Sequence, residues 1–154
     1  MKIYYVGSFD PPHIGHLNTY NKACAKLNAP IGIAICSNEL KKTPLLNLEE
    51  RARLCRIVFN SNDIIICQNS DEIKHFASEC DIFVRGYRNQ SDEHYIQLLA
   101  DYYKLEHIFE KVVYIPIDNE FYDVSSSKIR QLIENGEDFQ KYLPHVVFEY
   151  LSGR

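Results

Sequence analysis

Gly7-Ser8-Phe9-Asp10-Pro11-Pro12-His13-Ile14-Gly15-His16-Leu17 joins two segments of different character. The run before it, Ile3–Val6, is apolar and typical of a buried strand, and the segment after it, 17–27, has the pattern of a helix. A turn of small residues between a strand and a helix leaves backbone N–H groups free beside the positive end of the helix dipole. The stretch therefore predicts an anion site, to which His13 and His16 can add donors.

Length and charge narrow the class of protein. The chain has 154 residues, which predicts one domain over residues 1–154. Hydrophobic residues make up 45% and charged residues 25%, as in ordinary globular proteins. The net charge of −4 argues against a general nucleic-acid binder, so a site for a polyanion must be a local cluster of basic residues.

The cysteines and the apolar runs indicate the compartment. The number of cysteines is odd and no pair has C-x-x-C spacing, so we expect small buried hydrophobic residues in a reducing compartment. They are Cys24, Cys36, Cys55, Cys67 and Cys80. Met1 leads directly into a strand, so no signal peptide is expected, and no apolar run approaches the ~20 residues that span a membrane. A cytoplasmic location without a membrane partner follows.

Short apolar runs alternate with helical patterns along the chain. The runs are continuous, as in strands buried on both faces of a parallel sheet. They are Ile3–Val6, Ile31–Cys36, Ile64–Cys67, Ile82–Val84 and Val112–Ile117. The helical patterns cover 17–27, 48–59 with a capping box at Asn47 and Glu50, 71–78 and 92–105. This alternation predicts an α/β fold, a single Rossmann-like doubly wound parallel sheet of about five strands with helices on both faces.

The end of the chain departs from that alternation. The segment 125–135 has a helical pattern with Gly136 just past its end. A turn over 138–142 and a last helix over 144–151 follow. We therefore expect a short helical C-terminal tail. Ligands of a doubly wound sheet bind at the carboxyl ends of its strands, so the functional side chains are expected there.

A loop with two lysines follows the second expected strand. Lys41 and Lys42 lie in the segment 37–46, ahead of the capped helix. A lysine on such a loop can reach into the crevice and place a mobile positive charge on a phosphate, or it can simply be solvated. The residues alone leave both possibilities open.

Two arginines follow the fourth expected strand in the segment Arg85-Gly86-Tyr87-Arg88. Each can direct a planar guanidinium toward an oxyanion, and a guanidinium keeps its charge at any working pH. The alternative is pairing with nearby acidic residues, which are Asp81, Asp92 and Glu93.

Three serines precede the first helix of the tail, in Val124-Ser125-Ser126-Ser127-Lys128-Ile129-Arg130. Serines at a helix start cap its free N–H groups. The same geometry offers hydroxyls and amides to a phosphate, and three serines exceed what one cap needs. We therefore favour a phosphate site here.

The first of these motifs resembles a known signature. Ser8-Phe9-Asp10-Pro11 followed by His13-Ile14-Gly15-His16 is similar to the (T/H)xGH motif of the nucleotidylyltransferase superfamily. The resemblance implies a nucleoside triphosphate substrate, attack on its α-phosphorus and loss of pyrophosphate. The serine segment 124–130 is similar to the ISSS or ISST segment of the same superfamily.

Further segments resemble phosphopantetheine adenylyltransferases. Arg85–Arg88 matches their RGxR, 92–98 resembles their Asp-x-Glu-Tyr-Glu-x-Gln-Leu run, and the tail resembles their Phe-Leu-Pro-x-x-Val ending. The lysine loop is similar to their Lys-Lys-Pro stretch with one residue inserted, and we favour Lys41 over Lys42 as its functional lysine. Ile96 and Tyr103 depart from the family's glutamate and asparagine. The resemblance implies AMP transfer from ATP to 4′-phosphopantetheine, giving dephospho-coenzyme A in coenzyme A biosynthesis, by a homohexamer.

The resemblance also implies roles for single residues. The catalytic residues would be His16, Lys41 and Arg88, and the acceptor phosphate would be held by Ser8, Lys41 and Arg85. ATP would be bound by Gly7, Ser8, Phe9, His13, His16, Arg88, Asp92, Ser125, Ser126 and Ser127. Mg²⁺ would be bound mainly through substrate phosphates, without dedicated protein ligands. Asp10 before Pro11 suits a turn better than a metal site.

Two other functions remain open. The first motif resembles that of nicotinate or nicotinamide mononucleotide adenylyltransferases even more closely, because His13 stands where phosphopantetheine enzymes usually have threonine. Against this stand the short chain and the Arg85–Arg88 segment. A cytidylyltransferase is disfavoured, because an Arg-Thr-x-Gly-x-Ser-Thr segment is missing. A non-catalytic nucleotide-binding module on the same fold is the other possibility.

Overall fold

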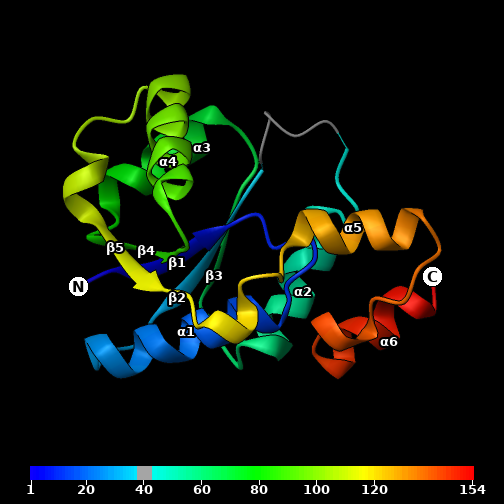
Figure 1. The fold of residues 1–154 in the computed structure, drawn as a ribbon. Coiled ribbons are helices and arrows are strands. Elements are labelled where there is room, and N and C mark those ends of the chain that lie inside the picture. The colour runs from blue at the N-terminus through cyan, green and yellow to red at the C-terminus, as the bar shows by residue number, and fades with distance from the viewer. Residues whose placement is uncertain (38–42) are drawn as a thin grey trace.

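Five parallel strands form one sheet in the order β3-β2-β1-β4-β5, in a computed structural model that describes residues 1–37 and 43–154 (Figure 1). The strands are β1 (Ile3–Gly7), β2 (Gly32–Cys36), β3 (Ile64–Cys67), β4 (Ile82–Tyr87) and β5 (Val112–Pro116). The predicted Rossmann-like α/β fold is confirmed. All five predicted runs are strands: β3 has the predicted bounds, and each of the other four differs at one end by one to three residues.

Helices cover both faces of the sheet. They are α1 (Ile14–Leu27), α2 (Leu48–Val58), α3 (Ser70–Glu79), α4 (Gln90–Tyr103), α5 (Ser126–Glu134) and α6 (His145–Ser152). Figure 1 shows α3 and α4 above the sheet and α1 and α2 below it. Within residues 1–37 and 43–154, three short 3-10 helices add to these, namely η1 (Ile108–Lys111), η2 (Asn119–Phe121) and η3 (Gln140–Tyr142). Among the described residues, no helix has the length and apolar character that crossing a membrane requires.

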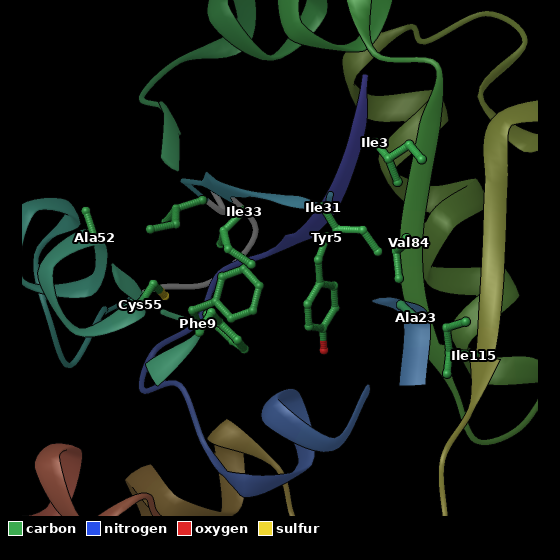
Figure 2. Close-up of a cluster of buried hydrophobic side chains, with 12 residues drawn as sticks. Ile3, Tyr5, Phe9, Ala23, Ile31, Ile33, Ala52, Cys55, Val84 and Ile115 are labelled. Carbon is green, nitrogen blue, oxygen red and sulfur yellow. The ribbon is translucent and has the colours of Figure 1, made fainter. Parts of the chain in front are cut away.

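The alternation of side chains along β1 builds two cores. Tyr5 points to the α1 and α2 face, where its ring lies beside that of Phe9 (Figure 2). The Tyr5 ring also makes an edge contact with Phe59. Tyr4 points to the other face, where it meets Phe76 beneath α3 and α4. Because the sheet is buried on both faces, its strands read as continuous apolar runs rather than alternating ones.

The C-terminal tail packs on the outside of α2. α5 and α6 share an apolar cluster with α2 and the segment before it, made of Leu46, Leu54, Val124, Ile129, Leu143 and Val147. α5 ends at Glu134, and Gly136 then adopts a φ of 69°, a left-handed conformation that favours glycine. This packing places the start of α5 beside the turn after β1, as Figure 1 shows.

Capping side chains set the helix starts. The predicted capping box at Asn47 and Glu50 is present at α2. α1 begins at Ile14, three residues before the predicted start, because His13 caps it. α4 begins at Gln90 rather than at 92, because Asn89 is its cap and Asp92 its third residue. In both helices the first turn contains polar residues, so the apolar pattern of the sequence places the helix start too late.

The strand order places a crevice between β1 and β4. From β1 the chain passes to β2 and β3 on one side, and then crosses to β4 and β5 on the other. The carboxyl ends of β1 and β4 therefore diverge at the point where the winding direction changes, which is where open α/β sheets bind ligands. The turn after Gly7 and the Arg85–Arg88 segment both lie at this point.

Candidate active site

A polar cavity of about 250 Å³ lies at the carboxyl ends of β1 and β4. It is lined by all ten residues that we predicted to bind ATP, and by Arg85 and Tyr95. These residues come from the turn after β1, the start of α1, the end of β4, the first half of α4 and the start of α5. The fold therefore brings together the described residues of the predicted site. Lys41, with Lys42, lies outside the described residues.

A second, apolar cavity adjoins the first between the sheet, α3 and α4. The two share Val6, Gly7, Ser8, Arg85 and Tyr95 in their linings. Beyond these, the second is lined mainly by apolar side chains, namely Ile73, Phe76, Ala77, Phe83, Ile96, Leu99, Leu105, Ile108 and Val112. Ile96 and Tyr103, the two departures from the family pattern, both line it. The polar cavity and the apolar cavity thus share a wall at the ends of β1 and β4.

His13 and His16 cap α1 reciprocally. The His13 Nδ1 accepts a hydrogen bond from the backbone N–H of His16 (3.2 Å), and the His16 Nδ1 accepts one from the backbone N–H of His13 (3.1 Å). The two rings stack with their centroids 3.6 Å apart. A Cβ at Gly15 would lie 2.9 Å from His13 Cε1, so only glycine leaves room for this stack. The capping bonds hold both rings at the mouth of the helix.

The same bonds fix the tautomers of the two histidines. A ring nitrogen that accepts from a backbone N–H carries no proton, so the proton of each ring is on Nε2. Both rings therefore keep an Nε2–H donor, and both line the polar cavity. Burial, with a smaller effect of the Arg88 charge, lowers the pKa of His13 to about 3. His13 is thus a neutral donor at physiological pH.

Three side chains from α2 and α5 hold the backbone of the turn after β1. Arg51 donates from Nη1 to the Ser8 carbonyl (3.1 Å) and from Nε to the Leu46 carbonyl (3.0 Å). Arg130 donates to the Asp10 carbonyl (2.7 Å), and Ser126 donates to the Pro11 carbonyl (2.8 Å). The turn is therefore fixed by residues distant from it in sequence.

Arg51 is a site residue that the sequence motifs did not predict. It is buried, with an exposed fraction of 5%, and burial lowers the pKa of its guanidinium. A signal was available, because Arg51 lies on the same helical stripe as the apolar Leu54, Cys55 and Val58. An arginine in such a stripe must have acceptors inside the protein.

Asp10 is a structural residue of the turn, as its place before proline indicated. Its buried carboxylate accepts hydrogen bonds from the backbone N–H groups of Leu45 (2.8 Å) and Leu46 (2.7 Å). The bond between Asp10 and Pro11 is cis. Asp10 thus ties the turn after β1 to the segment that leads into α2.

The two arginines after β4 have different surroundings. Arg85 donates to the Val6 carbonyl (2.8 Å) and lies 5.6 Å from the centre of the Tyr95 ring. Arg88 donates from Nη2 to the Val124 carbonyl, and its buried Nε has no hydrogen-bond partner among the described residues. A buried donor without a partner costs free energy, which an anion in the cavity would recover.

The acidic residue that could have neutralised Arg88 is engaged elsewhere. The Asp92 carboxylate accepts from the backbone N–H of Arg88 (2.7 Å) and of Asn89 (3.2 Å) at the start of α4. It acts there as part of the helix cap. No ion pair joins Asp92 to either guanidinium in the described residues, so the cavity keeps two cationic side chains.

Each serine of the α5 start already has a partner. Ser125 is the helix cap, accepting from the N–H of Lys128 (3.1 Å). The Ser126 hydroxyl donates to Pro11, and the Ser127 oxygen accepts from Arg130 (3.1 Å). Ser126 therefore has only its backbone N–H left as a donor toward an anion, while Ser127 retains its hydroxyl hydrogen. Both the cap and the phosphate interpretations fit this geometry.

The comparison with known families agrees with this architecture. The family model described as cytidylyltransferase-like matches residues 4–132, which is most of the chain. The chain belongs to this family. The family's domain includes the turn after β1, the Arg85–Arg88 segment and the serines of α5.

Curated relatives within the family cover nearly the whole chain. A phosphopantetheine adenylyltransferase of Methylacidiphilum infernorum is 31% identical over 98% of this chain and 89% of its own. One from Methylobacterium nodulans is 29% identical, over 97% and 94%. One from Coxiella burnetii is 28% identical, over 97% and 94%. The suspected family resemblance is confirmed.

A solved structure shares the fold at low identity. TmcAL of Thermotoga maritima, solved with alpha-thio ATP bound, superposes with a TM-score of 0.69 and 13% identity over 99% of this chain. The match spans 55% of the TmcAL chain, so this chain is about half its length. The similarity supports the architecture of the family domain.

The buried His13 predicts a specific loss of stability in acid. Below pH 6.5 the unfolded chain binds a proton at His13, whereas the folded protein does not until about pH 3. Folding stability contributed by His13 therefore falls by ~1.4 kcal/mol per pH unit as pH decreases through this window. In His13→Asn, which keeps a capping side chain without a titrating ring, urea unfolding should show a shallower pH dependence. Equal slopes in the two proteins would contradict a buried neutral His13.

Arg51 predicts a coupling between stability and the site. In Arg51→Lys the ammonium cannot bridge the Leu46 and Ser8 carbonyls, so we expect a loss of about 1–3 kcal/mol in the free energy of unfolding. The freed turn should also weaken ATP binding, measured by calorimetry. Arg53→Lys, on the exposed side of α2, is the matched control. If the two variants behave alike, Arg51 does not hold the turn.

Proposed function

We propose that this protein transfers AMP from ATP to 4′-phosphopantetheine, giving dephospho-coenzyme A and pyrophosphate. The observation that carries the proposal is the junction of a polar, donor-rich cavity with an apolar one at Ser8 and Arg85. A triphosphate needs the first kind of surface, and an acceptor with a phosphate at one end of a long arm needs both. The similarity to phosphopantetheine adenylyltransferases over nearly the whole chain supports the same conclusion.

The polar cavity has the charge and donors for the triphosphate. Its lining includes the guanidinium groups of Arg85 and Arg88, the Nε2–H groups of the two histidines and the start of α5. In the proposal, Arg88, Ser126 and Ser127 hold the outer phosphates of ATP. The unpartnered Nε of Arg88 and the N–H groups at the start of α5 are donors of the kind a phosphate accepts from.

The apolar cavity favours an extended arm over a pyridine ring. A nicotinate or nicotinamide mononucleotide would bring a charged ring with a carboxylate or amide, which needs buried polar partners. The cavity between the sheet, α3 and α4 is lined mainly by aliphatic side chains and Phe76 and Phe83. Its polar groups lie mostly at the Ser8 and Arg85 end, where the acceptor phosphate would bind.

The reaction requires no nucleophile from the protein. An oxygen of the acceptor phosphate attacks the α-phosphorus in line, a phosphodiester link forms, and the bond to pyrophosphate breaks. Catalysis then consists of positioning and of stabilising negative charge as it develops. The His16 Nε2–H would donate to an α-phosphate oxygen, and Ser8 and Arg85 would hold the acceptor phosphate. Lys41 would bridge the two phosphates.

Mg²⁺ would enter with ATP as part of the substrate. Within residues 1–37 and 43–154, no three His, Cys, Asp or Glu side chains are grouped to hold a metal ion. Asp92 is the one carboxylate among the described residues of the polar lining, and it accepts from two backbone N–H groups. This donor-rich lining fits an ion bound through phosphates and water, which is the usual mode for Mg²⁺.

Oligomeric state and location extend the proposal. By resemblance to its family we propose a homohexamer in the cytoplasm. Leu98 and Tyr102 lie one turn apart on α4 with exposed fractions of 53% and 48%, and they give a copy of the chain an apolar surface to cover. Light scattering on the purified protein tests the hexamer.

A substrate panel tests the proposed reaction. With ATP and Mg²⁺, we expect pyrophosphate release with 4′-phosphopantetheine, measured by a coupled assay, and formation of dephospho-coenzyme A by mass spectrometry. Turnover with nicotinate mononucleotide instead would replace the proposal with a pyridine nucleotide enzyme. ATP binding without turnover on either acceptor would indicate a non-catalytic module.

His16 predicts a rate effect without a binding effect. His16→Asn keeps a capping oxygen but loses the distal donor, so kcat should fall by ~10²–10³ while ATP affinity changes little. His145→Asn, with 76% of its side chain exposed near the C-terminus, is the control. A His16→Asn enzyme with nearly unchanged kcat would exclude His16 as the donor to the transition state.

A further inference from the structure

Two cysteines face each other at the ends of adjacent strands. Cys36 is the last residue of β2 and Cys67 the last residue of β3, and their Cα atoms are partners in the parallel register. The Ser37 N–H donates to the Cys67 carbonyl (2.9 Å), which continues the pairing past both cysteines. Neighbouring strands lie about 4.8 Å apart, within the 4.4–6.8 Å between Cα atoms that a disulfide spans.

Their side chains lie on the same face and in contact. Both belong to the apolar cluster beneath α3 and α4, and the Cys36 thiol hydrogen-bonds the Cys67 sulfur. The remaining cysteines are Cys24 on α1, Cys55 on α2 and Cys80 after α3. Cys80 is hydrogen-bonded to the Ile82 carbonyl (3.1 Å). Cys36 and Cys67 are thus a preassembled dithiol.

The dithiol adjoins two hollows of the surface. Cys36, which is half-buried, lines the apolar cavity together with Ser8, Ser37 and Arg85. Cys67 lines a groove between β3 and α3 on the open edge of the sheet. Cys67 itself is buried, with an exposed fraction of 1%, so an oxidant that reaches it must be as small as hydrogen peroxide and must enter through this groove.

We propose that Cys36 and Cys67 form an oxidation site, which closes to an intramolecular disulfide with a peroxide and reopens with a thiol reductant. The Cys67 sulfur attacks a peroxide oxygen, the O–O bond breaks, and water leaves with a sulfenic acid on Cys67. The Cys36 sulfur then attacks that sulfur and displaces a second water. Two thiols and one hydrogen peroxide thus give one disulfide and two waters.

The hydrogen bond between the two thiols supports this order of events. It lowers the pKa of Cys67, the acceptor, and together with burial it raises the pKa of Cys36, the donor. Cys67 is therefore the sulfur that forms a thiolate more readily, and thiolates are the species that attack peroxides. Cys36 then needs to react only with a sulfur already in contact with it.

Disulfide formation would alter the apolar cavity. The Cys36 sulfur would be drawn toward β3, and the strand end that carries Ser37 would move with it. If the proposed function holds, this changes the acceptor side of the site and leaves the ATP side alone. Oxidation should then raise the KM for 4′-phosphopantetheine several-fold and keep the KM for ATP within about twofold.

The test is oxidation of the full-length protein by hydrogen peroxide, followed by thiol counting and peptide mapping. Reactive thiols in denaturant should fall from five to three, with a mass loss of two hydrogens and one cross-linked pair of peptides that contain Cys36 and Cys67. A thiol reductant should reverse all three changes. A cross-link at other cysteines, higher oxides only, or five intact thiols would overturn the proposal.

Matched variants separate this proposal from the proposed function. Cys67→Ser and Cys67→Ala should form no disulfide, and peroxide should leave their KM for the acceptor unchanged. Cys24→Ser is the matched control, because it removes a half-buried cysteine of α1 and should oxidise like the wild type. Peroxide sensitivity that persists in both Cys67 variants would overturn the link to the cavity. Thiol counting and mapping need no turnover, so an inactive protein would refute the proposed reaction and leave the oxidation site testable.

Discussion

Side chains from other parts of the chain hold the turn after β1 in place by donating hydrogen bonds to its backbone carbonyls. Arg51, Ser126 and Arg130 donate to the carbonyls of residues 8, 10 and 11. Without these bonds, the carbonyls would point into a poorly solvated turn with no partner, at a cost of about 1–3 kcal/mol each. The position of His13 and His16, and hence of their donors, follows from this fixed turn.

This constraint makes the C-terminal tail part of the site. α5 and α6 bury an apolar cluster against α2, and that packing delivers Ser126 and Arg130 to the turn. α2 contributes Arg51 from the other side. The parallel sheet supplies the crevice, but the helices outside it decide how the crevice is lined. The contrast between the two cavities has a separate origin. α3 and α4 bring mainly apolar residues to the second cavity, and the Cys36–Cys67 pair lies at its edge.

The pattern of apolar residues predicted the fold well, because a parallel sheet buried on both faces requires such a pattern. Each strand is a short continuous apolar run, and each helix carries one apolar stripe. Helix starts were predicted less well, since they depend on capping residues such as His13 and Asn89 rather than on the stripe. Short 3-10 helices such as η1 have no periodicity to detect. The site residues were found because motif residues lie at strand ends and helix starts, positions that the topology gathers at one edge.

The sequence by itself determined the family, the sheet and the identity of the residues that line the polar cavity, because these depend on local pattern and on order along the chain. Only the tertiary structure decided what each residue touches. It showed Arg51 to hold the turn from a buried position, Asp92 to be part of a capping box rather than an ion-pair partner of the Arg88 guanidinium, and Ser126 to donate to Pro11. It also placed Cys36 beside Cys67. Such pairings arise between elements far apart in the chain, and their distances depend on how the helices pack on the sheet.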